Sequence, residues 1–154
     1  MPDTSPQSSP SLELSLGSSP QEIRAALDRV RRALRDAGWD DEARGTAELV
    51  LAEALNNIVE HAYGSAGDGQ IRLSVVTRGR TAELVICDGG GVMPGRRLPE
   101  GAPPRLDVGP PELPAGGFGW HLIRRLSDHL SYRHDDGRNR LEIRIRAEGE
   151  ASQD

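Results

Sequence analysis

The chain has 154 residues, 19 basic and 24 acidic, and its net charge of −5 excludes a general binder of nucleic acids or anionic membranes. Every basic residue is an arginine. The absence of lysine excludes P-loop NTPases and eukaryotic-type protein kinases, which both need a lysine at the phosphates. The single Cys87 excludes an internal disulfide and predicts a reducing, cytoplasmic compartment. No apolar run approaches the ~20 residues of a membrane span, and the N-terminus lacks a signal-peptide pattern.

The first part of the chain predicts one strand and two helices. Alternating leucines predict a short strand over residues 12–16. Ser19-Pro20-Gln21-Glu22 matches a capping box with proline at the first helical position, and Gly38 marks the end of the helix that it opens. A second, longer helix is predicted from Asp40 or Asp41 to Tyr63, where Gly64 stops it.

Three polar residues of the second helix, Glu53, Asn57 and His61, are spaced four residues apart. Each four-residue step turns only about 40° around a helix axis, so the three side chains form one stripe. The apolar face beside the stripe consists of Ala47, Leu51, Ala54, Leu55, Ile58 and Ala62. At the rim of a buried face, the Asn57 oxygen suits Mg²⁺, and the Glu53 carboxylate can accept a proton from an attacking hydroxyl or water. The same spacing also fits a solvated helix edge, because polar residues four apart are common on helices.

The second half of the chain predicts two hairpins, a loop and a third helix. The first hairpin alternates Ile71, Leu73 and Val75, turns at Arg78-Gly79-Arg80 and returns over residues 82–87. Residues 92–115 are rich in proline and glycine and predict a long loop, which in a compact domain is usually a functional lid or a disordered segment. The remaining elements are a helix over residues 120–130 and a hairpin of residues 131–133 and 140–146, turned at Asp136-Gly137.

These elements predict one domain over residues 11–147, between a disordered Ser/Pro-rich tail over 1–10 and an acidic tail over 148–154. Because the apolar alternation in the hairpins is one-sided, only one face of the sheet needs helices over it. We therefore predict an α/β fold, a two-layer sandwich in which helices cover one face of a mixed, mostly antiparallel sheet. Aromatic residues are few, so the core must consist of Leu, Ile, Val and Ala.

Two glycine-rich segments have the composition of a nucleotide site. Asp88 follows an apolar strand and precedes Gly89-Gly90-Gly91. A carboxylate there can accept a hydrogen bond from an exocyclic amine such as that of adenine, and the glycines let a flat ring approach the backbone. Gly116, Gly117 and Gly119 precede a helix, where free backbone N–H groups form an anion site. A strand-ending turn and a lid hinge with a helix cap are the alternative interpretations.

Jointly, these motifs resemble the GHKL ATPase superfamily and, within it, the small bacterial anti-sigma factor serine/threonine kinases. Residues 53–63 resemble the N box of that family, residues 87–90 its first glycine box, and residues 116–128 its second. The likeness extends from about Leu12 to Arg146. It implies a Bergerat-type ATP-binding fold in which the Pro/Gly-rich loop is the ATP lid.

The resemblance implies a role for each matching residue of the N box. Asn57 would ligate Mg²⁺. Glu53 would be the catalytic residue that orients or deprotonates the attacking hydroxyl. His61 matches the histidine of the N box and would lie at the nucleotide.

The resemblance also implies roles in the two glycine boxes. Asp88 would bind the adenine amino group, with Gly90 beneath the ring. Gly117, Phe118 and Gly119 would wrap the phosphates of ATP. Asn139 stands where many family members have a threonine that helps to hold adenine.

The implied function is a cytoplasmic kinase that uses ATP and Mg²⁺ to phosphorylate a STAS-type anti-sigma factor antagonist and that sequesters a sigma factor or similar output protein. Neither nucleic acid nor a membrane is an expected partner. Members of the family commonly dimerise, so a homodimer is compatible with the resemblance. Val92 stands where the family usually has a second spaced glycine, and Ala115 stands where some relatives carry arginine. These departures keep open an alternative function, a nucleotide-binding interaction module with little or no kinase activity.

Overall fold

The computed structural model describes residues 12–60, 70–89 and 117–147 of the chain. These ranges form three helices and five strands. In chain order they are β1 (Leu12–Gly17), α1 (Pro20–Asp36), α2 (Asp41–Ile58), β2 (Gln70–Arg78), β3 (Thr81–Asp88), α3 (Gly117–Leu126), β4 (His129–Asp135) and β5 (Arg138–Arg146). None of the helices in these ranges has the length and apolar character needed to cross a lipid bilayer.

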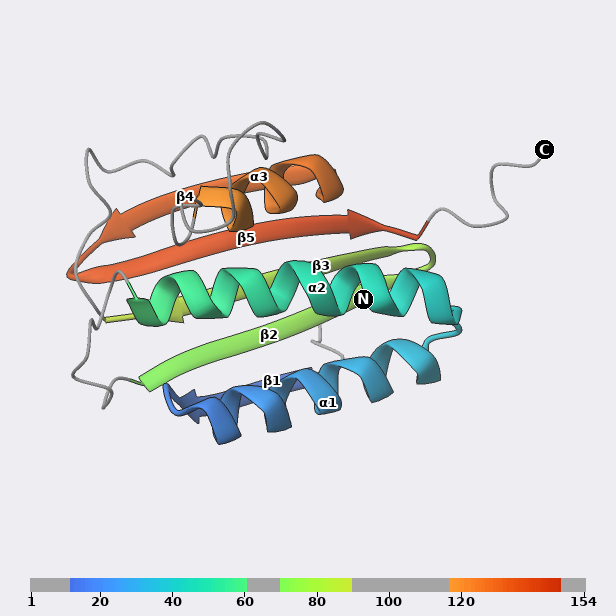
Figure 1. The fold of residues 1–154 in the computed structure, drawn as a ribbon, viewed down its shortest axis with the longest axis horizontal. Helices are drawn as coiled ribbons and strands as arrows, with labels where there is room; N and C mark the ends of the chain where they lie inside the picture. Colours follow the sequence, from blue (N-terminus) through green and yellow to red (C-terminus); the bar gives the residue numbers. More distant parts are fainter. Residues whose placement is uncertain (1–11, 61–69, 90–116, 148–154) are drawn as a thin grey trace, which may run out of the picture.

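The strands form one sheet in the order β1-β2-β3-β5-β4, and all four pairings are antiparallel. Figure 1 shows α1, α2 and α3 over the same face of this sheet, with α2 between the other two. The predicted two-layer α/β sandwich is therefore confirmed, but the prediction of a mixed sheet is wrong, because every described pairing is antiparallel. Because strand side chains alternate, every second residue of each strand faces the helices. The remaining residues lie on the opposite face, called the outer face below.

The predicted capping signal opens α1, but one of its two contacts differs. The Ser19 hydroxyl oxygen accepts a hydrogen bond from the Glu22 N–H at 3.2 Å, and Pro20 is the first helical residue. In a capping box the carboxylate at the fourth position accepts from the backbone N–H of the capping residue. Here the Glu22 carboxylate accepts from the Gly17 N–H at 2.7 Å. This contact ties the start of α1 to the end of β1.

The second helix begins where predicted and has the predicted apolar face. Asp40 caps α2, because its carboxylate accepts a hydrogen bond from the Ala43 N–H at 2.9 Å. The residues of the apolar face that the structure describes are all buried, together with Val50. The α-helix ends at Ile58 and passes into a wider π-helical turn over residues 59–60. The predicted end at Tyr63 lies outside the described residues.

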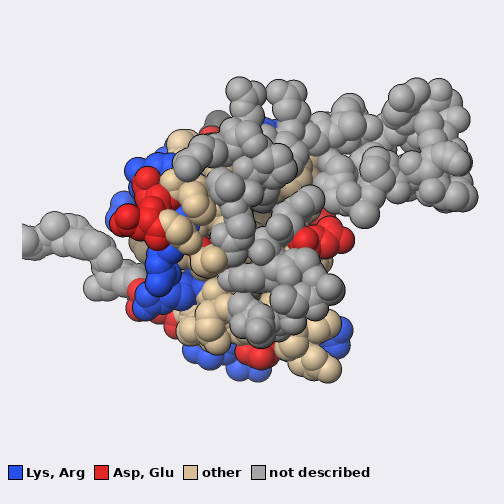
Figure 2. All heavy atoms as spheres, turned by 90° about the vertical axis from the view of Figure 1, so that its left-hand side faces the viewer, with Lys and Arg blue, Asp and Glu red and all other residues tan. Residues whose placement is uncertain are grey.

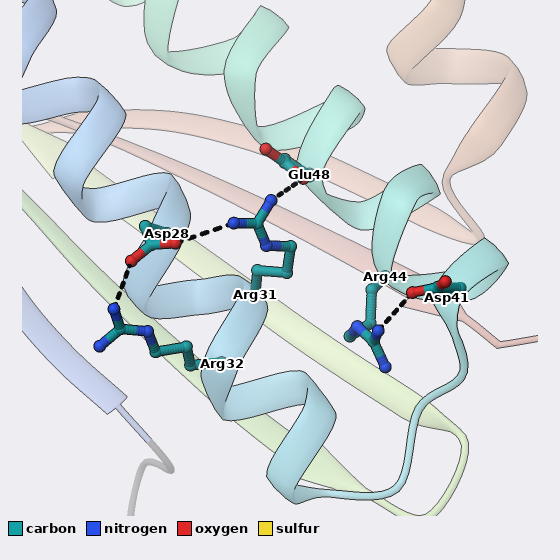
Figure 3. Close-up of polar contacts among 6 residues, drawn as sticks. All are labelled: Asp28, Arg31, Arg32, Asp41, Arg44 and Glu48. Atoms are coloured by element: carbon teal, nitrogen blue, oxygen red, sulfur yellow. Dashed lines mark hydrogen bonds and ion pairs between the residues drawn. The ribbon is translucent and has the colours of Figure 1, made fainter.

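Ion pairs lie along α1 and α2 on the exposed side of the helix layer, and one of those drawn in Figure 3 joins the two helices. Arg31 of α1 lies 2.8 Å from Asp28, one turn earlier, and 3.5 Å from Glu48 of α2. Arg44 pairs with Asp41 in the first turn of α2. Such solvent-exposed pairs contribute about 0–1 kcal/mol each. The two helices are therefore held together mainly by their buried apolar side chains.

Two tight turns fix the register of the hairpins. Gly79, between β2 and β3, has φ of +60°, and Asp136 and Gly137, between β4 and β5, have φ of +55° and +71°. A type I′ hairpin turn requires positive φ at both central residues, as Asp136 and Gly137 have, and a type II′ turn requires it only at the first, as at Gly79. In the resulting register Asp88 of β3 lies opposite Asn139 of β5.

The third helix differs from the prediction at both ends. It begins at Gly117 instead of Trp120 and ends at Leu126 instead of Leu130. Leu130 belongs to β4, where it lies opposite Ile143. The Asp128 N–H already donates a hydrogen bond to the Arg144 carbonyl at 2.6 Å, so the chain has joined the sheet edge before Leu130. A short apolar stretch is compatible with a helix or with a strand. Here hydrogen bonding to β5 at the edge of the sheet makes it a strand.

The core lies between the helices and the sheet and consists mostly of Leu, Ile, Val and Ala, as predicted. Both tryptophans are buried in it. The Trp39 indole N–H donates to the Gly79 carbonyl at 3.3 Å and so joins the start of α2 to the first hairpin turn.

Candidate functional site

Figure 1 shows that the predicted site segments meet at one end of the sandwich, the left-hand end of the view. The C-terminal end of α2, the end of β3, the start of α3 and the β4–β5 turn all lie there. Only four polar side chains are buried in the described part of the chain, namely Ser18, Asn57, Asp88 and Asn139. The last three belong to this end. Buried polar groups cost stability unless they are hydrogen-bonded, so their partners define what the site can do.

Asn57 is 2% exposed, and its side-chain N–H donates to the Glu53 carbonyl, one turn earlier, at 2.7 Å. A carbonyl can only accept, so this contact fixes which end of the amide is nitrogen. The other end, Oδ1, has no hydrogen bond to a described residue. An oxygen that is oriented, neutral and unpaired suits a hard cation such as Mg²⁺.

The Glu53 side chain is half-buried one helical turn before Asn57. Its carboxylate forms neither a hydrogen bond nor an ion pair with a described residue. The two residues thus form the predicted polar stripe at the rim of the buried face. The third member, His61, lies outside the described residues, as does Gly90.

Asp88 is the last residue of β3 and faces the helices, with 2% of its surface exposed. One of its carboxylate oxygens accepts a hydrogen bond from the Asn139 side-chain N–H at 2.9 Å. Because these residues are register partners on adjacent strands, the sheet itself brings them together. The amide holds the carboxylate in one orientation as an acceptor for a ligand's N–H group.

Asn139 is itself held by two residues of β4. Its Oδ1 accepts from the Tyr132 hydroxyl at 2.5 Å and lies 2.9 Å from His134 Nδ1. An amide oxygen can only accept, so His134 carries a proton on Nδ1. With Oδ1 occupied by two donors, the amide presents its N–H to Asp88.

Sequence reasoning singled out Asp88 and Asn139 but gave no role to Tyr132 or His134. Their role depends on the register of β4 with β5, in which His134 lies opposite Asn139. The Asp-Gly turn is the sequence signal that could have supplied this register. Two-residue turns make the flanking residues opposite, and alternation then places Tyr132 and His134 on the same face.

Gly117, Phe118 and Gly119 form the first turn of α3. The N–H groups in the first turn of a helix have no partners within the helix and carry its positive dipole end, so they attract anions. Trp120, which follows, is 1% exposed and anchors this turn to the core. The predicted anion-binding segment is therefore helical from Gly117 onward.

The donor set at this end fits magnesium that is bound partly through a ligand's phosphates. Within the described ranges, no three His, Cys, Asp or Glu side chains lie close enough to hold a metal by themselves. Mg²⁺ is often bound by one or two protein oxygens together with waters and phosphates. The free Asn57 oxygen matches such a site, and so does the negative dipole end of α2.

Comparison with known proteins identifies the family of the chain. Residues 16–145 match the histidine kinase-like ATPase domain. The chain is 37% identical to the serine/threonine-protein kinase BtrW of Bordetella bronchiseptica over 112 residues, which are 72% of this chain and 75% of that protein. It is 24% identical to the serine-protein kinase RsbW of Oceanobacillus iheyensis, over 82% of this chain and 80% of the relative.

Two solved structures share the fold at low sequence identity. The RsbU and RsbW domains of a Mycobacterium tuberculosis protein superpose with a TM-score of 0.57 at 16% identity, covering 88% of this chain and 31% of that one. A blue-light activated histidine kinase of Erythrobacter litoralis gives a TM-score of 0.52 at 16% identity, covering 84% of this chain and 43% of that one. From its matching residues, its fold and its relatives, the chain belongs to the histidine kinase-like ATPase family.

Proposed function

We propose that this chain is an ATP-dependent protein serine/threonine kinase of the anti-sigma type. It transfers the γ-phosphoryl group of ATP to a serine or threonine of a STAS-type antagonist protein in the cytoplasm. It also sequesters a sigma factor or a similar output protein. The observation that carries this proposal is the gathering of three buried polar residues, Asn57, Asp88 and Asn139, at one end of the sandwich.

Adenine recognition follows from the carboxylate on β3. Adenine carries an exocyclic amine, whereas guanine presents a carbonyl at the same position. Asp88, held by Asn139, accepts a hydrogen bond from the amine and has no donor for the carbonyl. The site therefore selects ATP over GTP, because the guanine carbonyl would face the carboxylate with no hydrogen between the two oxygens.

The phosphates of the nucleotide lie between α2 and α3 in this proposal. The first turn of α3 would supply backbone N–H groups, and the Asn57 oxygen would hold Mg²⁺, which would neutralise charge on the phosphates. The Glu53 carboxylate accepts the proton of the attacking hydroxyl. As the new P–O bond forms, the bond between the γ-phosphorus and its bridging oxygen breaks, and ADP leaves with the electron pair.

The test of the kinase is phosphoryl transfer from γ-labelled ATP to a STAS-type antagonist that binds the purified chain. We expect Glu53→Gln to retain ATP binding and to lower transfer by at least about a hundredfold, as loss of a general base does. Glu42→Gln is the matched control, because Glu42 is an exposed carboxylate at the opposite end of the same helix. Equal rates of phosphoryl transfer by wild type and Glu53→Gln would show that Glu53 is not the general base.

Nucleotide binding is tested separately by titrating a fluorescent ATP analogue with and without Mg²⁺. We expect Asn57→Ala to abolish the increase in affinity that Mg²⁺ produces. An unchanged Mg²⁺ effect would place the metal elsewhere.

A second candidate function is a nucleotide-binding interaction module without kinase activity. The substitutions Val92 and Ala115 in the glycine-rich segments favour it. It predicts ATP-dependent binding of the antagonist with no transfer of label at saturating ATP. Transfer that depends on Glu53 contradicts it.

A further inference from the structure

A groove with a volume of about 600 Å³ lies on the outer face of the sheet, away from the helices. Three arginines line it: Arg72 of β2 and Arg138 and Arg140 of β5. Among the described residues that line it, Glu13 is the only acidic one. In Figure 2, which views the strand ends, arginines and carboxylates gather on the left, where the outer face lies. The whole chain has a net charge of −5, so this excess of positive charge is local.

The strand register explains why the arginines come together. Ser15, Arg72, Cys87, Arg140 and Arg133 are successive register partners across all five strands. Neighbouring strands are about 4.8 Å apart, so this row crosses the sheet within the reach of one short peptide. Arg133 and Arg140 lie directly opposite each other, an arrangement of like charges that lowers stability. A ligand with carboxylates removes this cost.

The arginines of the groove differ in their pairing. Arg140 Nε donates to the Glu142 carboxylate at 2.7 Å, and this hydrogen bond raises the pKa of the Arg140 guanidinium. Arg72 and Arg138 form no hydrogen bond or ion pair with any residue that the structure describes. Two guanidinium groups in the groove are thus available to an outside partner.

The other end of the outer face offers a comparison. A smaller depression of about 330 Å³ there is lined by three arginines, among them Arg78 and Arg146, and by two carboxylates, Glu83 and Asp128. Both carboxylates pair with Arg144, at 4.0 and 3.2 Å. This end has less space and less unbalanced positive charge than the larger groove.

We propose that the larger groove, called the arginine groove, binds an extended acidic segment of a partner protein. Guanidinium groups bind carboxylates through paired N–H groups, and an open groove across strands suits an extended chain better than a compact ligand. Asp88, Asn139, Tyr132 and His134 form a hydrogen-bonded group, called the buried polar network, on the helix-covered face of the sheet. The groove lies on the opposite face of the same strand ends. Cys87 precedes Asp88, and Arg138 and Arg140 flank Asn139. The proposal stands independently of kinase activity.

The test uses the full chain and a fluorescent peptide of alternating glutamate and serine, followed by anisotropy. We expect saturable binding that weakens with added salt. Arg72→Gln/Arg138→Gln is expected to weaken it by about tenfold or more, because two charge pairs are lost. Arg78→Gln/Arg146→Gln removes the same charge from the same two strands outside the groove, and is expected to change affinity by less than about threefold. Thermal unfolding of both variants checks that they fold.

Cys87 gives a second readout, because it is the only cysteine and lines the groove. Bound peptide is expected to slow its reaction with a thiol reagent in wild type and in the Arg78/Arg146 variant, but not in the Arg72/Arg138 variant. Equal losses of affinity in both double variants, or no protection of Cys87, overturn the proposal. The proposal is also overturned if the wild-type chain is a dimer and Arg72→Gln/Arg138→Gln is a monomer, because a second copy of the chain then covers this face.

Discussion

The two faces of the sheet differ in chemistry although they belong to the same strands. At the end of β3, Cys87 points to the arginine groove, and Asp88 points to the buried polar network. At the start of β5, Asn139 belongs to the network, while Arg138 and Arg140 line the groove. A single step along the chain separates a buried, oriented hydrogen-bonding group from an exposed charge.

The difference comes from the helix layer. On the covered face, water is excluded and each polar group needs a defined partner, so Asp88 and Asn139 are fixed in geometry. On the outer face, water screens charges and tolerates unpaired guanidinium groups. The covered face is therefore suited to selecting a small ligand, and the outer face to attracting a charged partner.

The largest expected contrast is in stability. Ile143→Ala opens a cavity in the core under the helices, since Ile143 is 1% exposed, and we expect it to lower the free energy of unfolding by about 2–5 kcal/mol. Glu142→Ala, one residue earlier and on the outer face, should cost less than about 1 kcal/mol. Urea denaturation of both variants measures the two values. Equal losses would mean that the outer face is packed against something in solution.

The next contrast is in nucleotide affinity at the end of β3. Asp88→Asn keeps the shape of the side chain but removes the charged acceptor, and we expect ATP to bind about 10–100 times more weakly. Cys87→Ser changes the neighbouring residue on the outer face and should leave ATP affinity unchanged. Calorimetric titration with ATP compares them. A loss in Cys87→Ser as large as in Asp88→Asn would contradict the separation of the two faces.

A smaller effect on ATP affinity is expected from the residues that hold the Asn139 side chain. Tyr132→Phe removes one of the two donors to the Asn139 oxygen, which lets the amide rotate and disorders its contact with Asp88. We expect ATP affinity to fall about threefold to tenfold and the preference for ATP over GTP to narrow. Ser131→Ala, on the outer side of the same strand, is the control. A general loss of folding would change both nucleotides equally, so an unchanged preference would argue against this positioning role.

Much of the fold could be predicted because local signals agreed with the final structure. The Asp-Gly turn and the Ser19 cap each mark the end of an element, and the one-sided alternation of β5 specifies the face that it buries. The end of the third helix was predicted wrongly because Leu130 fits a helical pattern as well as a strand. Only its pairing with β5 decides between them, and that contact is not local in sequence.

The part of the candidate site that lies on a single helix could be predicted from the sequence, and the part that joins different strands could not. Glu53 and Asn57 are one turn apart, so helical spacing made them candidates, and the resemblance to the GHKL superfamily gave each a role. The contact of Asp88 with Asn139 joins residues 51 positions apart. Periodicity within one helix or strand cannot predict this contact. The contacts of Tyr132 and His134 with the Asn139 oxygen depend in addition on the register of a third strand, β4.

The smallest expected effect tests the outer face alone. Glu142→Gln removes the partner of Arg140, and because both side chains are more than a third exposed, we expect a loss of no more than about 1 kcal/mol that disappears at high salt. The pKa of Arg140 is raised by Glu142, so the stabilisation is complete below the unfolded-state pKa of arginine and declines only as pH rises through the higher folded-state value. The difference in unfolding free energy between wild type and variant should therefore be constant from about pH 6 to 9. A clear slope in that range would mean that a group other than Arg140 responds to the loss of Glu142, and the nearby thiol of Cys87 would then be examined with Cys87→Ser.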